Sequence, residues 1–204
     1  MKDFLVATGN AHKLIEIQQI IDAAGYSFTA RGLKEFPAIV IPPEDGDTFA
    51  ANAIIKAKAA AQQSGLIAIA DDSGICVDAL DGAPGIYSAR FAADEGADHI
   101  DSRNNEKLLR LLKDVPDEQR GGHFACAIAI ATPEGEVRTV EGRVYGVIAH
   151  EESGEGGFGY DPLFFVPELN KTLSEVTAEE KNAISHRGQA LRLMLPILAE
   201  MLAD

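Results

Sequence analysis

The sequence lacks several features that would place a protein in a membrane or outside the cell. No apolar run among its 204 residues approaches the ~18 residues that a membrane-spanning helix requires. The N-terminus has no signal-peptide layout of basic start, apolar stretch and small cleavage-site residues. Only two cysteines are present, Cys76 and Cys126; they form no C-x-x-C pair, so we expect buried free thiols. These absences predict a cytoplasmic protein with no membrane partner.

Basic residues are also scarce. The 18 Lys and Arg residues stand against 32 Asp and Glu residues, which gives a formal net charge of -14. A general nucleic-acid binder usually carries a basic surface, so nucleic acid is disfavoured as a partner. A small polyanionic substrate remains possible, but it would have to meet a local cluster of cations. The positions of the Lys and Arg residues therefore matter more than their number.

The composition is otherwise that of an ordinary globular protein, with 46% hydrophobic and 25% charged residues. No internal repeat, low-complexity tract or long linker divides the chain, so we expect a single domain over residues 1–204 with room for two lobes. Apolar patterns typical of strands cover residues 4–6, 67–70, 75–77, 123–131, 137–149 and 163–166. Helical spacing covers residues 11–24, 48–64, 102–113 and 185–202. This mixture of strand–loop–helix units and a hairpin predicts an α/β fold with a mixed sheet.

The first candidate site is the loop after the first strand. The segment Ala7-Thr8-Gly9-Asn10-Ala11-His12-Lys13 leads from a strand into a helix, whose N-terminus offers free N–H groups to an anion. Lys13 in the first helical turn would oppose the helix dipole unless a bound phosphate compensated it. The G-x-x-x-x-G-K-[ST] spacing of a Walker A loop is absent, and an ordinary capped helix is the alternative interpretation.

The second candidate site is the pair Asp71 and Asp72. We expect residues 71–74 to form a turn between two short strands. Neighbouring carboxylates raise each other's pKa, so the pair is unfavourable unless a cation shares it. Mg²⁺, a hard ion that prefers oxygen ligands, is the natural candidate. One acid could then hold the metal while the other orients a water, although a solvated acidic turn is an alternative.

The helix at 48–64 supplies further candidates. Asn52 and Lys56 are four residues apart and share one face, although a lone lysine is more often a surface residue. Glu44 lies in the acidic segment before this helix. It could reach a metal, or merely favour the helix N-terminus.

A glycine-rich loop precedes the last strand. Its nominal G-x-G-x-x-G begins at Gly154, but Pro162 and a strand follow, where a dinucleotide site requires a helix. The glycines on either side of Phe158 would instead let a flat ring stack on that aromatic face. Thr177 to Glu180 form a capping box that starts a short helix with Lys181.

A histidine and an arginine open the final helix. Ser185 is a plain N-cap residue, and His186 and Arg187 follow in the first turn, where a cation is unfavourable without an anion nearby. Arg187 suits bidentate contact with a phosphate, and His186 could donate to a base oxygen.

Five motifs occur together in one order: A-T-G-N-x-x-K, A-D-D-S-G, G-A-P-G-I-Y-S-A-R-F, F-G-Y-D-P and S-H-R-G-Q-A-L. In this order, from Thr8 to Leu191, they resemble the inosine triphosphate pyrophosphatase family, which acts on ITP, dITP and XTP. The resemblance implies hydrolysis of a nucleoside triphosphate to the monophosphate and pyrophosphate, Mg²⁺ dependence and a homodimer. It also implies an elongated mixed central sheet with flanking helices and two lobes around a substrate cleft.

The resemblance also implies roles for individual residues. Asp72 would be the proton acceptor, Glu44 and Asp72 would hold the metal, and Asp71 would be a further metal residue in a supporting role. The expected substrate contacts are Thr8, Gly9, Asn10, Ala11, His12, Lys13, Asn52, Lys56, Ser73, Phe158, Gly159, Tyr160, Asp161, Lys181, His186 and Arg187. The alternatives are a pyrophosphatase for other modified or pyrimidine nucleotides and a nucleotide-binding module without enzymatic activity.

Overall fold

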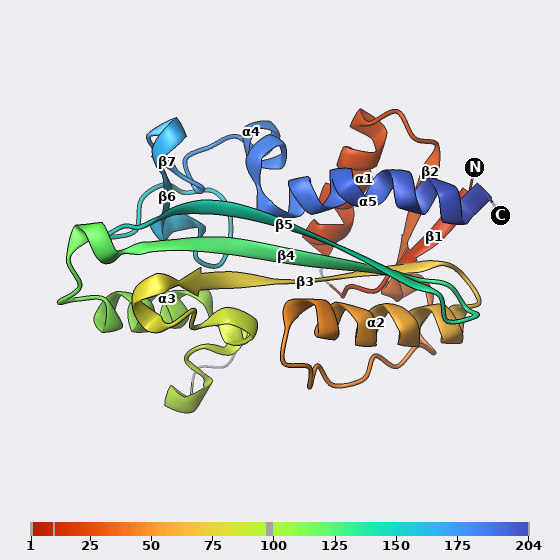
Figure 1. Cartoon of the computed structure of the whole chain (residues 1–204), viewed down its shortest axis with the longest axis horizontal. Coiled ribbons are helices and arrows are strands. Elements are labelled where there is room, and N and C mark those ends of the chain that lie inside the picture. Colours follow the sequence, from red (N-terminus) through yellow and green to blue (C-terminus); the bar gives the residue numbers. More distant parts are fainter. Residues whose placement is uncertain (1, 10, 97–99, 204) are drawn as a thin grey trace. The chain divides into compact units, whose positions relative to one another are not determined.

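The protein is built on a mixed β-sheet (Figure 1). The computed structural model describes residues 2–9, 11–96 and 100–203, apart from the side chains of Ala11 and His12. The strands are β1 (Lys2–Val6), β2 (Phe28–Gly32), β3 (Ala68–Val77), β4 (Gly121–Ala131), β5 (Val137–Ile148), β6 (Phe164–Val166) and β7 (Lys171–Thr172). The α-helices are α1 (Ala11–Ala23), α2 (Phe49–Ser64), α3 (Asp101–Leu111), α4 (Ala178–Ile184) and α5 (His186–Ala203).

The described strands form one seven-stranded sheet in the order β2-β1-β3-β4-β5-β6-β7. β1 is parallel to both β2 and β3, whereas β6 is antiparallel to β5 and β7. The sequence-based prediction of an α/β fold with a mixed sheet and flanking helices is therefore confirmed. Within the described part of the chain, no helix is long and apolar enough to cross a membrane.

The chain divides into two compact units. Unit 1 comprises residues 1–72, 126–142 and 186–204, and therefore holds α1, α2 and α5. Unit 2 comprises residues 73–125 and 143–185, and holds α3 and α4.

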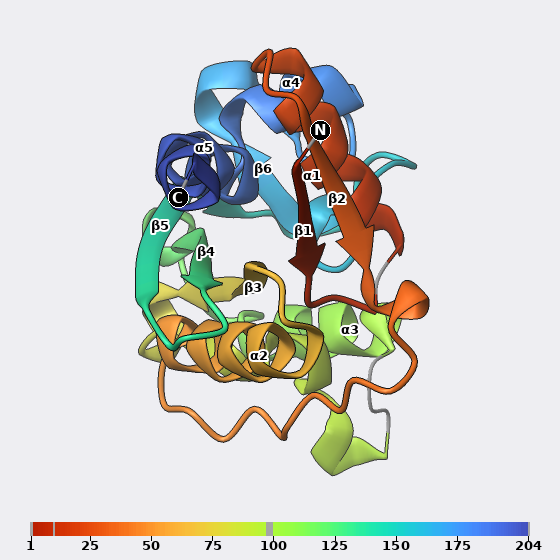
Figure 2. The same cartoon turned by 90° about the vertical axis from the view of Figure 1, so that its right-hand side faces the viewer.

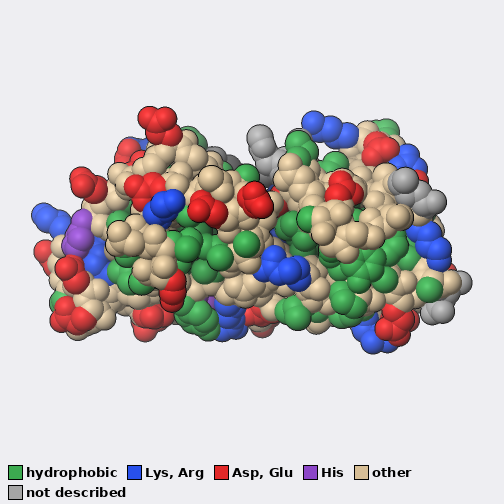
Figure 3. Space-filling model, turned by 90° about the horizontal axis from the view of Figure 1, so that it is seen from above, with side chains coloured by type: hydrophobic (Ala, Val, Ile, Leu, Met, Phe, Trp, Pro, Cys, Tyr) green, Lys and Arg blue, Asp and Glu red, His purple; other side chains and the backbone are tan. Residues whose placement is uncertain are grey.

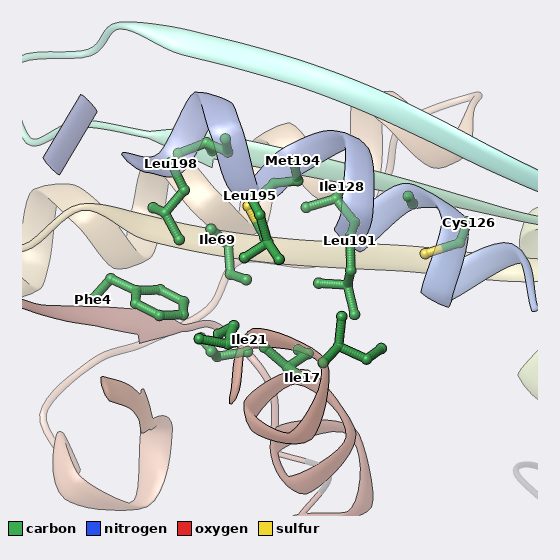
Figure 4. Packing of buried hydrophobic residues seen from close by; sticks show 14 residues of the cluster. Phe4, Ile17, Ile21, Ile69, Cys126, Ile128, Leu191, Met194, Leu195 and Leu198 are labelled. Atoms are coloured by element: carbon green, nitrogen blue, oxygen red, sulfur yellow. The ribbon is translucent and has the colours of Figure 1, made fainter. Parts of the chain in front are cut away.

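Unit 1 buries apolar side chains on both faces of its strands. In β1, Phe4 and Val6 pack in a cluster with α1 and α5, whereas Leu5 packs in a second cluster with the alanine-rich face of α2. Figure 2 shows α1 and α5 on one side of β1 and α2 on the other, and Figure 4 shows Ile17 of α1 and Leu191 of α5 in the first cluster. Because side chains alternate along a strand, successive residues of β1 and β3 point to opposite faces of the sheet.

Local signals fix the ends of several helices. The side chain of Thr48 accepts a hydrogen bond from the N–H of Ala51 at the start of α2. Thr177 and Glu180 form the expected capping box of α4. Gly25, just after α1, has a φ of 76°, which favours glycine. These helix boundaries confirm the prediction from sequence.

The prediction for residues 67–77 was wrong. Instead of two short strands joined by a turn, β3 runs without interruption from Ala68 to Val77 and includes Asp71, Asp72 and Ser73. The composition suggested a turn, but a different constraint explains Gly74. A Cβ atom at Gly74 would lie 2.3 Å from Ser88 Oγ, so glycine permits the close approach of the segment Gly85–Arg90.

Unit 2 has its own core, in which α3 packs against the ends of β3 and β4. Arg120, just before β4, is 1% exposed and donates to the carbonyl oxygens of Leu112, Ile148 and Ala149 at 2.6 to 2.9 Å. This one buried side chain therefore joins the end of α3 to the end of β5. Neither cysteine forms a disulfide; Cys126 is buried, as predicted, whereas Cys76 is only half-buried.

Candidate active site

The alternation of side chains along β3 separates the two acids that are adjacent in sequence. Ile69 belongs to the cluster with α1 and α5, and Ala70 belongs to the cluster with α2. The same alternation directs Asp71 towards α1 and α5 and Asp72 towards α2. The two carboxylates therefore meet different partners, which a tight turn would not have required.

Asp71 is buried between two cations. Its Oδ2 atom lies 2.7 Å from Lys13 Nζ and 3.2 Å from Arg187 Nε. Arg187, only 1% exposed, also places a terminal nitrogen 2.9 Å from an oxygen of Glu16. Burial raises the pKa of Asp71, but Lys13 and Arg187 outweigh this effect and hold the pKa well below its usual range. Asp71 is therefore a permanent anion that orders two cations.

Asp72 has a different environment on the α2 face. Its Oδ2 accepts a hydrogen bond from Asn52 Nδ2 at 3.1 Å, and its Oδ1 lies 3.3 Å from Lys56 Nζ. Lys56 also lies 3.1 Å from an oxygen of Glu44. The spacing of Asn52 and Lys56 thus places both on one helix face, as predicted, and the structure directs that face at Asp72.

Burial and nearby charges shift the pKa values of Asp72 and Lys56. Burial raises the pKa of Asp72, and the nearby Glu44 carboxylate adds to the rise, so the pKa is above its usual value despite the opposing effect of Lys56. Burial lowers the pKa of Lys56, but the carboxylates of Asp72 and Glu44 reverse the change, and the lysine stays charged. Asp72 is therefore the more basic of the two adjacent acids, a property that suits a proton acceptor.

The described side chains contain a pair of carboxylates that could hold a divalent cation. Glu44 and Asp72 both contact Lys56 Nζ, so their oxygens converge on one positive charge. No group of three or more His, Cys, Asp or Glu side chains suited to a metal occurs within the described residues. The pair of Glu44 and Asp72 fits Mg²⁺, which commonly binds through one or two carboxylates together with substrate phosphates and water. Asp71 faces away from this pair and already contacts two cations.

The predicted phosphate loop connects β1 to α1. The N–H of Thr8 donates to the carbonyl of Val6 at 2.8 Å, and Gly9 faces open space, since a Cβ atom there would meet nothing within 4 Å. Asn10 lies outside the described residues, as do the side chains of Ala11 and His12. Lys13 follows in the first turn of α1, where Asp71 is its anionic partner.

The predicted base loop lies in unit 2 and is held together by Asp161. One oxygen of this buried carboxylate accepts a hydrogen bond from the N–H of Phe158 at 2.8 Å and pairs with Lys181 Nζ at 2.5 Å. Lys181 Nζ also lies 4.6 Å from the centroid of the Phe158 ring. The Phe158 side chain is 47% exposed, so a planar ligand could still reach it.

Tyr160 and Ser73 complete the predicted contacts of unit 2. The buried Tyr160 donates its hydroxyl to the carbonyl of Ser88 at 2.8 Å, so this hydroxyl has a partner within unit 2. Ser73 is half-buried on β3.

His186 and Arg187 open α5 in unit 1, and both are buried. A Cβ atom at Gly142 of β5 would lie 2.2 Å from the carbonyl oxygen of His186, so glycine at 142 permits the close packing of this helix start. Arg187 contacts carboxylates in the structure, whereas the sequence suggested a phosphate partner.

Three residues of these networks were not predicted. Glu16 lies one helical turn after Lys13, a spacing that suggests a shared face. Asp101 and Asn105, both on α3, contact the backbone of Gly159. Their sequence context indicates only an amphipathic helix, and no local pattern connects them with a loop more than fifty residues away.

A comparison with known proteins identifies the chain. A model of the Ham1 family matches residues 4–197. The chain belongs to the Ham1 family. Its sequence is 52% identical over 194 residues to a dITP/XTP pyrophosphatase of Desulforamulus reducens, with 95% of this chain and 94% of that protein covered. A dITP/XTP pyrophosphatase of Streptomyces coelicolor is 48% identical over 202 residues, with coverages of 99% and 100%.

Solved structures of Ham1 proteins show the same fold. A HAM1 protein from Coxiella burnetii superposes with a TM-score of 0.88 at 40% identity, covering 98% of this chain and 100% of that one. A nucleoside-triphosphatase, also named a dITP/XTP pyrophosphatase, from Mycobacterium abscessus gives a TM-score of 0.77 at 43% identity, with coverages of 95% and 99%. The family that the sequence motifs resemble is thus confirmed.

Proposed function

We propose that this protein hydrolyses noncanonical purine nucleoside triphosphates (ITP, dITP and XTP) to the monophosphate and pyrophosphate, and so removes them from the nucleotide pool. The relatives named as dITP/XTP pyrophosphatases support the substrate class. One structural observation carries the reaction: β3 directs Asp71 to two cations and leaves Asp72 with Glu44, Asn52 and Lys56.

In the proposed reaction a water attacks the α-phosphorus and transfers its proton to Asp72, and pyrophosphate leaves. Asn52 orients the carboxylate through its hydrogen bond. Lys56 and Lys13, each beside a carboxylate, supply positive charge for the phosphates. Arg187 acts through Asp71, whose position it fixes.

A divalent cation, expected to be Mg²⁺, would neutralise charge on the triphosphate. Glu44 and Asp72 are the residues that would hold it, since their oxygens already converge on one cation. Asp71 is left out of this metal set, because it serves Lys13 and Arg187 on the opposite face of β3.

The base would bind at the loop of unit 2. The half-exposed ring of Phe158 offers a stacking face, and Lys181 lies against the same ring. Selectivity would come from donors to the 6-oxo group of hypoxanthine and xanthine, among which we place His186. The 6-amino group of adenine would present a donor to those donors, a mismatch that costs about 1–3 kcal/mol.

The decisive experiment measures pyrophosphate release from ITP, dITP, XTP, GTP, ATP and one pyrimidine triphosphate, each with Mg²⁺ and with EDTA. We expect Mg²⁺-dependent release that is fastest from ITP, dITP and XTP. Asp72→Asn should abolish it, whereas Asp114→Asn, at an exposed position outside the site, should not. The absence of release from ITP and XTP by the wild-type protein would refute the proposal.

The charge of the surface disfavours nucleic acid as a partner. On the face shown in Figure 3, Asp and Glu side chains are spread among Lys and Arg side chains, and the formal net charge is -14. A nucleoside triphosphate is therefore the expected partner rather than nucleic acid. A homodimer and a cytoplasmic location stay predictions, which sedimentation and cell fractionation can test.

A further inference from the structure

The peptide groups around Phe158 are fixed by side chains that the proposed reaction does not use. The N–H of Gly159 donates to an oxygen of Asp101 at 2.9 Å. The carbonyl of Gly159 accepts a hydrogen bond from Asn105 Nδ2 at 3.1 Å. Both polar backbone groups of this one glycine are therefore tied to α3.

The two α3 residues can act together because of helical geometry. Asp101 is the first residue of α3 and Asn105 follows four residues later, so both lie on one face of the helix. Asn105 Nδ2 also donates to an oxygen of Glu152 at 2.7 Å, which fixes the orientation of the amide. An acidic residue in the first turn also suits the helix dipole.

The backbone conformation at position 159 requires a glycine. Gly159 has a φ of 63°, in the left-handed region that side chains disfavour. Before the Phe158 side chain in the chain direction, the N–H of Phe158 donates to Asp161. The backbone is thus fixed before and after a phenylalanine whose own ring is 47% exposed. A large exposed aromatic on a fixed backbone is typical of a preorganised binding surface rather than of a core.

The buried asparagine is not arranged for stability alone. Asn105 is 3% exposed, and its Oδ1 atom is buried with no hydrogen-bond partner among the residues that the structure describes. An unpaired buried acceptor is unfavourable, and such groups are often associated with functional constraints. The neighbouring Asn104 is the opposite case, because it donates to the carbonyl of Ala89 and accepts from the N–H of Ala92.

We infer that Asp101 and Asn105 are positioning residues that set the affinity and selectivity for the base by holding the Gly159 peptide, and with it the Phe158 ring. The inference rests on the proposed function, since it assigns the base to this loop. The two residues act through the backbone and touch no reacting atom. Their removal should therefore weaken base binding without impairing the chemistry at Asp72.

The test compares Asn105→Ala with Asn104→Ala, which removes a buried asparagine of similar exposure from the same helix. Steady-state kinetics with ITP and ATP and thermal melting are measured for both. We expect Asn105→Ala to raise the KM for ITP about five- to tenfold, with kcat within about twofold, as loss of a binding hydrogen bond predicts. The ratio of kcat/KM for ITP over ATP should fall by a similar factor, because the contacts that distinguish the bases require the ring in place. Asn104→Ala should lower the melting temperature but keep that ratio.

Asp101, on the exposed first turn of α3, provides a second test if Asn105→Ala does not fold. Asp101→Ala should raise the KM for ITP, and Asp101→Asn, which keeps an acceptor oxygen, should restore it. The inference is overturned if neither Asn105→Ala nor Asp101→Ala changes KM or the ratio, or if Asn104→Ala changes the ratio equally. Inactivity of the wild-type protein towards ITP and XTP would instead refute the proposed function.

Discussion

Removing the charge of Asp71 should mainly lower stability, whereas removing that of Asp72 should mainly lower activity, although the two residues are neighbours. Asp71→Asn leaves Arg187 and Lys13 without their shared carboxylate at 3.2 and 2.7 Å. Breaking a buried ion pair by removing one partner costs about 3–5 kcal/mol. Arg187 keeps Glu16 and the Lys13 side chain is 20% exposed, so we expect the lower end, about 3 kcal/mol. For a chain of this size that corresponds to a fall in Tm of about 6–12 °C.

Asp72→Asn should change stability little. The charge of Asp72 is already disfavoured by burial and by Glu44, and asparagine can still accept the hydrogen bond from Asn52. Lys56 keeps Glu44 at 3.1 Å, so the variant loses one contact, and we expect the free energy of unfolding to change by no more than about 1 kcal/mol, or about 2–4 °C in Tm. The kcat for ITP should fall by about 10²–10⁴-fold, the usual contribution of a positioned general base.

Calorimetry and pyrophosphate release, measured on both variants at a temperature where both are folded, check this pair of predictions. The reasoning fails if Asp72→Asn lowers the Tm as much as Asp71→Asn does. It also fails if Asp72→Asn keeps a kcat near that of the wild type. Either result would mean that the two faces of β3 do not separate a stabilising acid from a reacting one.

Three further predictions concern other buried groups. Arg120→Met should leave three carbonyls without their donor and lower the free energy of unfolding by about 3–5 kcal/mol, with kcat unchanged at low temperature; denaturant titration would test this. Burial and then the charge of Asp71 raise the pKa of Cys126 to about 12, so in a Cys76→Ser variant a disulfide reagent at pH 8 should modify no thiol until the protein is unfolded. His186→Ala should reduce the preference for ITP over ATP about tenfold, as loss of one buried donor predicts, and equal kcat/KM ratios before and after the change would exclude His186 from base selection.

Local interactions made much of the fold predictable. The cap at Thr48, the capping box at Thr177 and the stop at Gly25 each depend on a few neighbouring residues, and each occurs as expected. The alternation of large and small apolar residues in β4 likewise follows from burial on both faces, since Ile128 and Ile130 pack with α1 and α5 and the alanine between them packs with α2.

The continuity of β3 could not be predicted in this way. Asp-Asp-Ser-Gly has the composition of a turn, and only charges supplied by α1, α2 and α5 make the acids acceptable within a strand. The carboxylate partners of Arg187, Asp71 and Glu16, are also far from it in sequence, so no local pattern predicts these ion pairs. Distance in sequence also hides Asn105, whose link to Gly159 joins residues 54 positions apart.

The uninterrupted β3 also constrains how this segment can change in length. Deleting Ala70 would exchange the faces of the two carboxylates. Asp72 would then face Lys13 and Arg187, and Asp71 would face Asn52. Deleting both Ile69 and Ala70 would keep each acid on its face but shift it along the strand by about 6–7 Å, beyond the reach of its present partners. We therefore expect homologues to vary the loops around β3 in length while keeping the spacing from its apolar residues to the acids fixed.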